Sequence, residues 1–186
     1  MNNLALYLAL TVLATPPFAA FQAPPANPTA TTLAAFTKRV NDYANLRNSF
    51  DKGDSRLKRT GDAAQLVAAQ TALAQKIQAA RAGAKQGDIF TAEDRALLRR
   101  LLNPALKGAD GAENKAAIRD DNPGPMTLKV NAPYPAKEPL STVPLDVLKA
   151  LPVLPEDLQY RFVGKHLILY DARSGLVVDV LPNAMP

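Results

Sequence analysis

The chain has 186 residues, 47% of them apolar and 21% charged, a balance that is typical of a globular protein and argues against wholesale disorder. It contains no cysteine and a single histidine, which excludes a transition-metal site with several thiolate or imidazole ligands from one chain. The net charge is +5, yet residues 36–119 hold 16 basic against 9 acidic side chains and residues 120–186 hold 6 against 8. We interpret the basic half as a solvated helical surface, because no aromatic residues are interleaved as in nucleic-acid-binding proteins. Contact with an anionic partner is the alternative.

The chain begins with the features of an export leader. The stretch "LALYLALTVLATPPFAA" (Leu4 to Ala20) opens with an apolar run of about the length of a secretory h-region, too short to span a bilayer comfortably. A proline-rich segment with little to bury follows it. We therefore predict that residues 1–30 form a signal peptide and a tether. Because the n-region "MNN" carries no basic residue, an uncleaved anchor is the alternative.

Residues 31–122 carry the periodicity of helices. The first helix is expected to use Thr31 or Thr32 as its N-cap, and the second to use Asp62. Apolar residues three or four positions apart predict one buried face for each helix. The first face comprises Leu33, Phe36, Val40, Tyr43, Leu46 and Phe50, and the second comprises Leu66, Leu73, Ile77 and Ala80.

Two further helices are predicted before the chain changes character. Thr91 followed by Glu93 and Asp94 is typical of a capped helix start with acids in the first turn. The apolar face of that helix comprises Leu97, Leu98, Leu101 and Leu102. Asp110 with Glu113 predicts another cap, for a short helix that ends near Asp121.

Prolines mark the beginning of the β-containing region, residues 123–186. The sequence "DDNPGP" (Asp120 to Pro125) ends the helices, and the alternation of "MTLKV" (Met126 to Val130) then predicts a half-buried strand. Prolines on both sides favour an edge position for this strand. "LDVLKAL", which follows Pro144, predicts one short helix.

The stretch "YRFVGKHLILYDARSGLVVDVLPN" predicts a three-stranded meander. Gly164-Lys165 suits a two-residue hairpin turn with glycine first, as a type II′ turn requires. In that register the apolar face comprises Tyr160, Phe162, Leu167 and Leu169. If "ARSG" forms the second loop, Leu176 and Val178 join this face, and His166 faces Asp179.

The opposite face of the meander is the candidate contact surface. We expect it to be exposed and to carry Arg161, His166, Tyr170 and Asp179. Asp179 would stabilise the imidazolium form of His166. The simpler interpretation is a strand histidine with a cross-strand acidic partner and no further role. No catalytic, cofactor-binding or metal-binding residues are predicted, since no nucleophile, phosphate-loop, dinucleotide or zinc motif occurs.

Three stretches carry a resemblance: "ARAGAKQGDIFT", "RDDNPGP" and "LPEDLQYRFVGKHLILYDARSGLVVDVLPNAMP". They are similar to a family of uncharacterised exported bacterial proteins with no assigned activity. The resemblance implies export and covers most of the chain after the leader. The tail also loosely resembles the C-terminal meander of periplasmic RcnB-like proteins of nickel and cobalt homeostasis, although this chain offers few metal ligands.

The sequence therefore predicts an α+β fold, with an N-terminal helical hairpin or array followed by a small antiparallel β-meander packed on it. We expect a periplasmic or secreted, non-enzymatic interaction protein with an envelope protein as its partner. A metal-stress protein of the nickel/cobalt type and a hydrolase of unrecognised type are the alternatives. No cofactor, no nucleic acid and no transmembrane span beyond the leader are expected, and the oligomeric state is left open.

Overall fold

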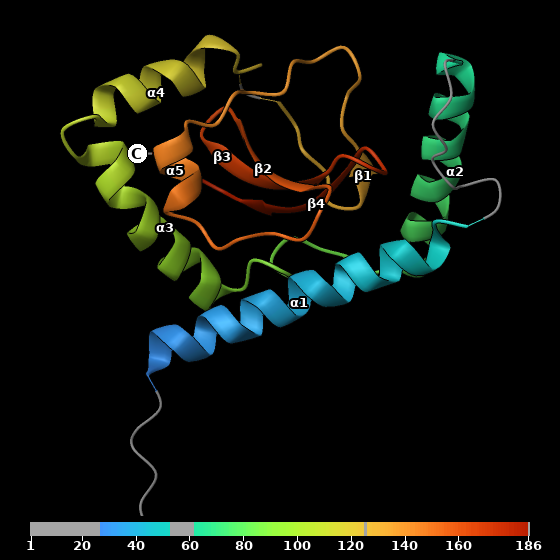
Figure 1. Ribbon diagram of the computed structural model, residues 1–186, viewed down its shortest axis with the longest axis horizontal. Helices are drawn as coiled ribbons and strands as arrows, with labels where there is room; N and C mark the ends of the chain where they lie inside the picture. The colour runs from blue at the N-terminus through green and yellow to red at the C-terminus, as the bar shows by residue number, and fades with distance from the viewer. Residues whose placement is uncertain (1–26, 53–61, 125, 186) are drawn as a thin grey trace, which may run out of the picture.

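The computed structural model describes residues 27–52, 62–124 and 126–185. Among these residues, four helices come first in the chain, and a four-stranded antiparallel sheet with one further short helix follows them, so the predicted α+β class is confirmed. Figure 1 shows α1 lying across one side of the sheet, with α3 and α4 at one end of the molecule and α2 at the other. The predicted leader lies outside the described residues.

Helix α1 (Pro28–Phe50) begins earlier than predicted. Asn27 is its N-cap, and the Asn27 side chain accepts a hydrogen bond from the amide of Thr29 at 3.0 Å. The predicted caps, Thr31 and Thr32, lie inside the first turns, where their hydroxyls donate to carbonyls four positions earlier. The physical reason is Pro28, whose ring sets a helical φ and whose missing N–H costs nothing at the first helical position.

The predicted buried face of α1 is largely confirmed, with one charged addition. Phe36, Val40 and Tyr43 are buried, and Phe36 stacks on Phe90 with 5.9 Å between ring centroids. Arg47, one turn beyond Tyr43, is also buried, at 3% exposure. Each buried apolar side chain of this size contributes about 1.5–3 kcal/mol to holding the helix against the sheet.

Helix α2 (Ala63–Ala80) packs with only its second half. Asp62 caps it as predicted and accepts hydrogen bonds from two backbone amides of the first turn. Leu73 and Ile77 are buried, whereas Leu66 and Val67 are exposed by 37% and 62%. The burial predicted for Leu66 is wrong because the first turns of α2 rise beyond the neighbouring elements (Figure 1).

Helices α3 (Ala92–Lys107) and α4 (Gly111–Asp120) form the other end of the molecule. Thr91 and Asp94 make the reciprocal capping contacts that the sequence predicts for α3. Asp110 does occupy the N-cap of α4, but its side chain makes no capping hydrogen bond. Leu97, Leu98 and Leu102 are buried in α3.

The sheet has the order β1-β4-β3-β2, with all neighbours antiparallel. Its strands are β1 (Ala132–Pro133), β2 (Leu158–Val163), β3 (His166–Asp171) and β4 (Leu176–Leu181). The predicted hairpin register is confirmed, since Val163 pairs with His166, Phe162 with Leu167 and Tyr160 with Leu169. Gly164 has φ 56°, the positive value that its place in this turn requires.

The strand predicted at Met126–Val130 does not form. This segment pairs with no other strand, and the edge strand is instead the short β1, which pairs with β4. The predicted alternation nevertheless describes the burial of the segment. Met126, Leu128 and Val130 are partly buried against the sheet, whereas Thr127 and Lys129 are exposed. The short helix α5 (Leu145–Lys149) is present as predicted.

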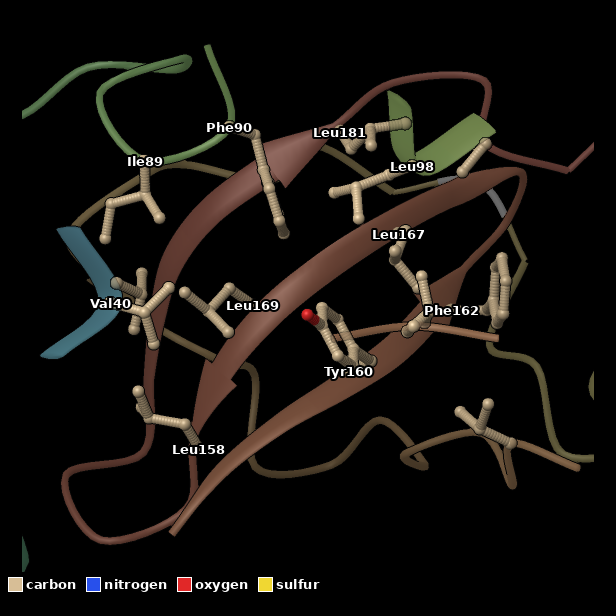
Figure 2. Packing of buried hydrophobic residues seen from close by; sticks show 14 of the residues in the cluster. Val40, Ile89, Phe90, Leu98, Leu158, Tyr160, Phe162, Leu167, Leu169 and Leu181 are labelled. Atoms are coloured by element: carbon tan, nitrogen blue, oxygen red, sulfur yellow. The ribbon is translucent and has the colours of Figure 1, made fainter. Parts of the chain in front are cut away.

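The two faces of the sheet are both covered. Figure 2 shows Tyr160, Phe162, Leu167 and Leu169 on the main-core face, toward Val40, Phe90 and Leu98. The other face carries a second buried cluster, comprising Tyr134, Val163, Ile168, Val177 and Val180. Because residues from Met126 to Leu140 pack over this cluster, the prediction of an exposed second face is wrong.

Candidate functional site

Asp179 does not lie on the predicted contact face. Leu169 pairs with Asp179 but Tyr170 pairs with Val177, so Val178 is an extra residue in β4. This bulge turns Asp179 to the main-core side, where its side chain is fully buried. Its carboxylate accepts hydrogen bonds from the amides of Gly87, Ile89 and Phe90 at 3.0, 2.8 and 2.8 Å. The residue therefore holds the loop before α3 against the sheet.

His166 and Asp179 are consequently not partners. The Nδ1 atom of His166 accepts a hydrogen bond from the amide of Asn183 at 3.1 Å, and Leu169 is the residue opposite Asp179. Met185 donates from its amide to the carbonyl of Lys165 in the same turn. His166 thus helps to attach the C-terminal segment to the β2–β3 hairpin.

Arg161 and Tyr170 are half-buried and lie in different hollows of the surface. The guanidinium of Arg161 donates to Gln159 Oε1 and to the carbonyl of Ser141. Tyr170 packs edge-on against Tyr134, with 5.9 Å between ring centroids, and burial raises the pKa of its phenol. The four predicted site residues are therefore not brought together.

A buried polar cluster surrounds Asp171 at the end of β3. The carboxylate accepts hydrogen bonds from the hydroxyls of Tyr43 and Ser174 at 2.8 and 2.7 Å and from Arg47 at 3.3 Å. Arg47 also donates to the carbonyl of Glu156 at 3.1 Å. Burial, with the Asp171 charge adding to it, raises the pKa of Tyr43 well above its usual range. The cluster connects α1 to the end of the β2–β3 pair opposite the hairpin turn, where Leu158 pairs with Asp171, and its charged groups are mutually satisfied.

An accessible apolar surface lies between α5 and the free edge of β2. A hollow of about 380 Å³ opens there, which we call the β2-edge groove. Its lining comprises Val143, Leu148, Pro152, Val153, Leu154, Leu158, Gln159, Tyr160 and Arg161. Val153 is 92% exposed, Leu148 is 40% exposed, and the nearby α5 residue Leu145 is 64% exposed. Exposed side chains of this size gathered around one hollow are typical of a contact surface.

The main chain of β2 is open at one position along this groove. In an antiparallel ladder, every second residue of an edge strand directs its N–H and C=O away from its neighbour. Val163 and His166 flank the two-residue turn and bond to each other, so Phe162, Tyr160 and Leu158 face outward. The Ser141 hydroxyl accepts a hydrogen bond from the Phe162 N–H at 2.9 Å and donates one to the Phe162 carbonyl at 2.8 Å. The Leu158 N–H donates to the carbonyl of Pro155. No loop in the described part of the chain hydrogen-bonds to the main chain of Tyr160.

A second hollow, of about 490 Å³, separates α2 from the β1 side of the sheet. Gln70, Gln75 and Gln78 of α2 line one wall, and Tyr134 and Tyr170 line the other. Two of these amide groups are already engaged, since Gln70 donates to Ala172 and Gln78 donates to Asn131. These hydrogen bonds connect α2 to the sheet across the hollow.

Within residues 27–52, 62–124 and 126–185, no three His, Asp or Glu side chains lie close enough to hold a metal ion. No helix in the same ranges is long and apolar enough to cross a membrane. Comparison with protein-family models, curated proteins and solved structures finds no match to this chain.

Proposed function

We propose that this chain is a non-enzymatic interaction protein, exported to the bacterial periplasm or envelope, that binds a protein partner through the β2-edge groove. The observation that carries the proposal is the exposure of Leu148 and Val153 in the lining of one hollow, together with that of Leu145 on the same short helix as Leu148. Burying these three side chains against a partner would contribute several kcal/mol, since about 25 cal/mol is gained per Å² of apolar surface removed from water. The groove lining includes no carboxylate and no histidine, so its chemistry is that of contact rather than acid–base catalysis.

Export is supported by the apolar run from Leu4 to Ala20 and by the resemblance to exported bacterial proteins. A reporter fusion tests it: residues 1–30 are joined to alkaline phosphatase, which is active only outside the cytoplasm. We expect activity from this fusion and its loss when Leu8 and Leu10 are both replaced by arginine. Equal activity of the two fusions would contradict export through this leader.

Site-specific crosslinking tests the contact surface. A photoreactive benzoylphenylalanine is placed at position 153 in one version of the full chain and at position 67 in another, and both are expressed in the native host. Val67 is the matched control because it is also an exposed valine, at 62%, but lies on α2 outside the groove. We expect a discrete adduct with one protein from position 153 and none with that protein from position 67.

A substitution then decides whether the adduct reports binding. Val153→Asp places a charge in the apolar surface without disturbing a buried residue, and it should abolish co-purification of the crosslinked protein. Val67→Asp should leave co-purification unchanged. Recovery of the same partner with the Val153→Asp protein would rule out the groove as the binding surface.

A further inference from the structure

We propose that the partner binds the β2-edge groove as a short extended segment that pairs with Tyr160 and carries an acidic side chain next to Arg161. This inference rests on the proposed function, because it specifies the chemistry of the partner at the same surface. Three observations carry it: the open main chain of Tyr160, the apolar hollow beside it and the uncompensated charge of Arg161.

The open main chain selects an extended occupant. The N–H and C=O of Tyr160 face the groove, whereas the N–H of Leu158 and both main-chain groups of Phe162 are bonded to this chain's own loops. An extended backbone can accept a hydrogen bond from the Tyr160 N–H and donate one to the Tyr160 carbonyl. The main-chain groups of a helix are already hydrogen-bonded within the helix. Because the loops already engage Phe162 and the Leu158 N–H, the pairing segment is short.

The side chains of such a segment would alternate between two different environments. A partner residue opposite Tyr160 shares the face of the Tyr160 side chain, and its neighbours lie on the face of Arg161. The hollow of about 380 Å³, with Leu148 and Leu154 in its lining, is large enough for one or two apolar side chains. An apolar residue therefore fits opposite Tyr160.

Arg161 supplies the charge complementarity. Its guanidinium donates only to uncharged acceptors, the side-chain oxygen of Gln159 and the carbonyl of Ser141. In the described part of the chain no carboxylate lies within ion-pair distance of it. A guanidinium beside apolar surface favours a carboxylate partner. We therefore expect Asp or Glu next to the apolar residue of the partner segment.

A phage-displayed library of random twelve-residue peptides is the probe. It is selected on the full chain after depletion on the Val153→Asp protein, so that only groove-dependent peptides are kept. We expect enriched peptides to share an apolar residue flanked by Asp or Glu and to contain no proline at the pairing position. Failure to enrich any groove-dependent peptide, or enrichment of basic peptides, would overturn the proposal.

The selected peptide is then synthesised and added to the isotope-labelled chain. Strand pairing predicts at least tenfold slower amide hydrogen exchange at Tyr160, together with loss of binding when the apolar residue of the peptide is N-methylated. Arg161→Gln should weaken the acidic peptide about tenfold, and Arg161→Lys should weaken it less. Thermal unfolding of each variant shows whether it is folded.

The outcomes separate this inference from the proposed function. If the crosslinked partner depends on Val153 but protects no amide at Tyr160 when it is bound, the groove is a contact surface and strand pairing is wrong. If neither partner nor peptide depends on Val153, both proposals fail.

Discussion

The carboxylate of Asp179 in β4 accepts a 2.8 Å hydrogen bond from the backbone amide of Phe90, 89 positions earlier in the chain. The amides of Gly87 and Ile89 donate to the same carboxylate. No cation pairs with Asp179 among the described residues, so backbone dipoles alone stabilise this buried group. The loop that leads into α3 is thereby positioned by the last strand.

Asp179→Asn should therefore destabilise the protein by about 3 kcal/mol. The amide nitrogen of asparagine is a donor and cannot accept from the loop amides, so at least one buried N–H loses its partner. Urea unfolding followed by far-ultraviolet circular dichroism measures the change. The matched control is Asp42→Asn, which removes an exposed ion pair with Lys38 and should cost about 0.5 kcal/mol or less. Equal effects of the two substitutions would contradict the role assigned to Asp179.

Tyr43→Phe should cost about 1–2 kcal/mol at neutral pH. The substitution removes the buried hydrogen bond to Asp171 but leaves the ring in the core, and Ser174 and Arg47 still contact the carboxylate. Urea unfolding at pH 7 checks this value. A destabilisation above about 4 kcal/mol would mean that the hydroxyl supports more than this one contact.

The same substitution should change the response to alkaline pH. Burial raises the pKa of Tyr43 above the unfolded value of about 10, so the folded phenol keeps a proton that the unfolded chain releases. This contribution to stability is complete below about pH 10 and is lost as the pH rises further. Tyr43→Phe should reduce the fall in unfolding free energy above pH 10 by about 1.4 kcal/mol per pH unit. Tyr134→Phe, whose phenol is less buried, should reduce it less.

Ser141→Ala should destabilise the protein by about 1–2 kcal/mol and expose more of the β2 edge. The hydroxyl of Ser141 both accepts from the Phe162 amide and donates to the Phe162 carbonyl, so both groups lose a partner. Amide exchange at Phe162 should accelerate relative to its neighbours in β2. Ser49→Ala, which removes a hydroxyl from the exposed side of α1, should change stability by less than about 0.5 kcal/mol. Unchanged exchange at Phe162 would contradict the bridging role of Ser141.

Local signals predicted most of the fold. Gly164-Lys165 set the hairpin register because a two-residue turn leaves only one pairing that keeps four apolar residues together. The bulge at Val178 could not be predicted in the same way. "LVV" is apolar at every position, so nothing in it indicates which residue is the extra one, and a shift of one position reverses the face of Asp179. The strand predicted at Met126–Val130 failed for a related reason, since strand pairing depends on a distant partner.

The candidate site was predictable only in part. Arg161 was selected from the sequence for its place on the sheet, and it does line the groove. Val153 and Leu148 could not be predicted as groove residues, because nothing in the sequence around a single apolar residue near a proline indicates whether the folded chain will bury it. The burial of Arg47 did have a signal, since it continues the spacing of Phe36, Val40 and Tyr43 along α1.

The connection between Asp179 and residues 87–90 also constrains the order in which the chain can acquire structure. Helix α1 and the loop before α3 pack on strands that follow them in the chain, so a chain growing from its N-terminus lacks their binding surface until Leu181 has appeared. Contacts of such wide sequence separation form late and slowly. A chain that ends at Leu176 should therefore remain unfolded throughout, because it lacks most of β4.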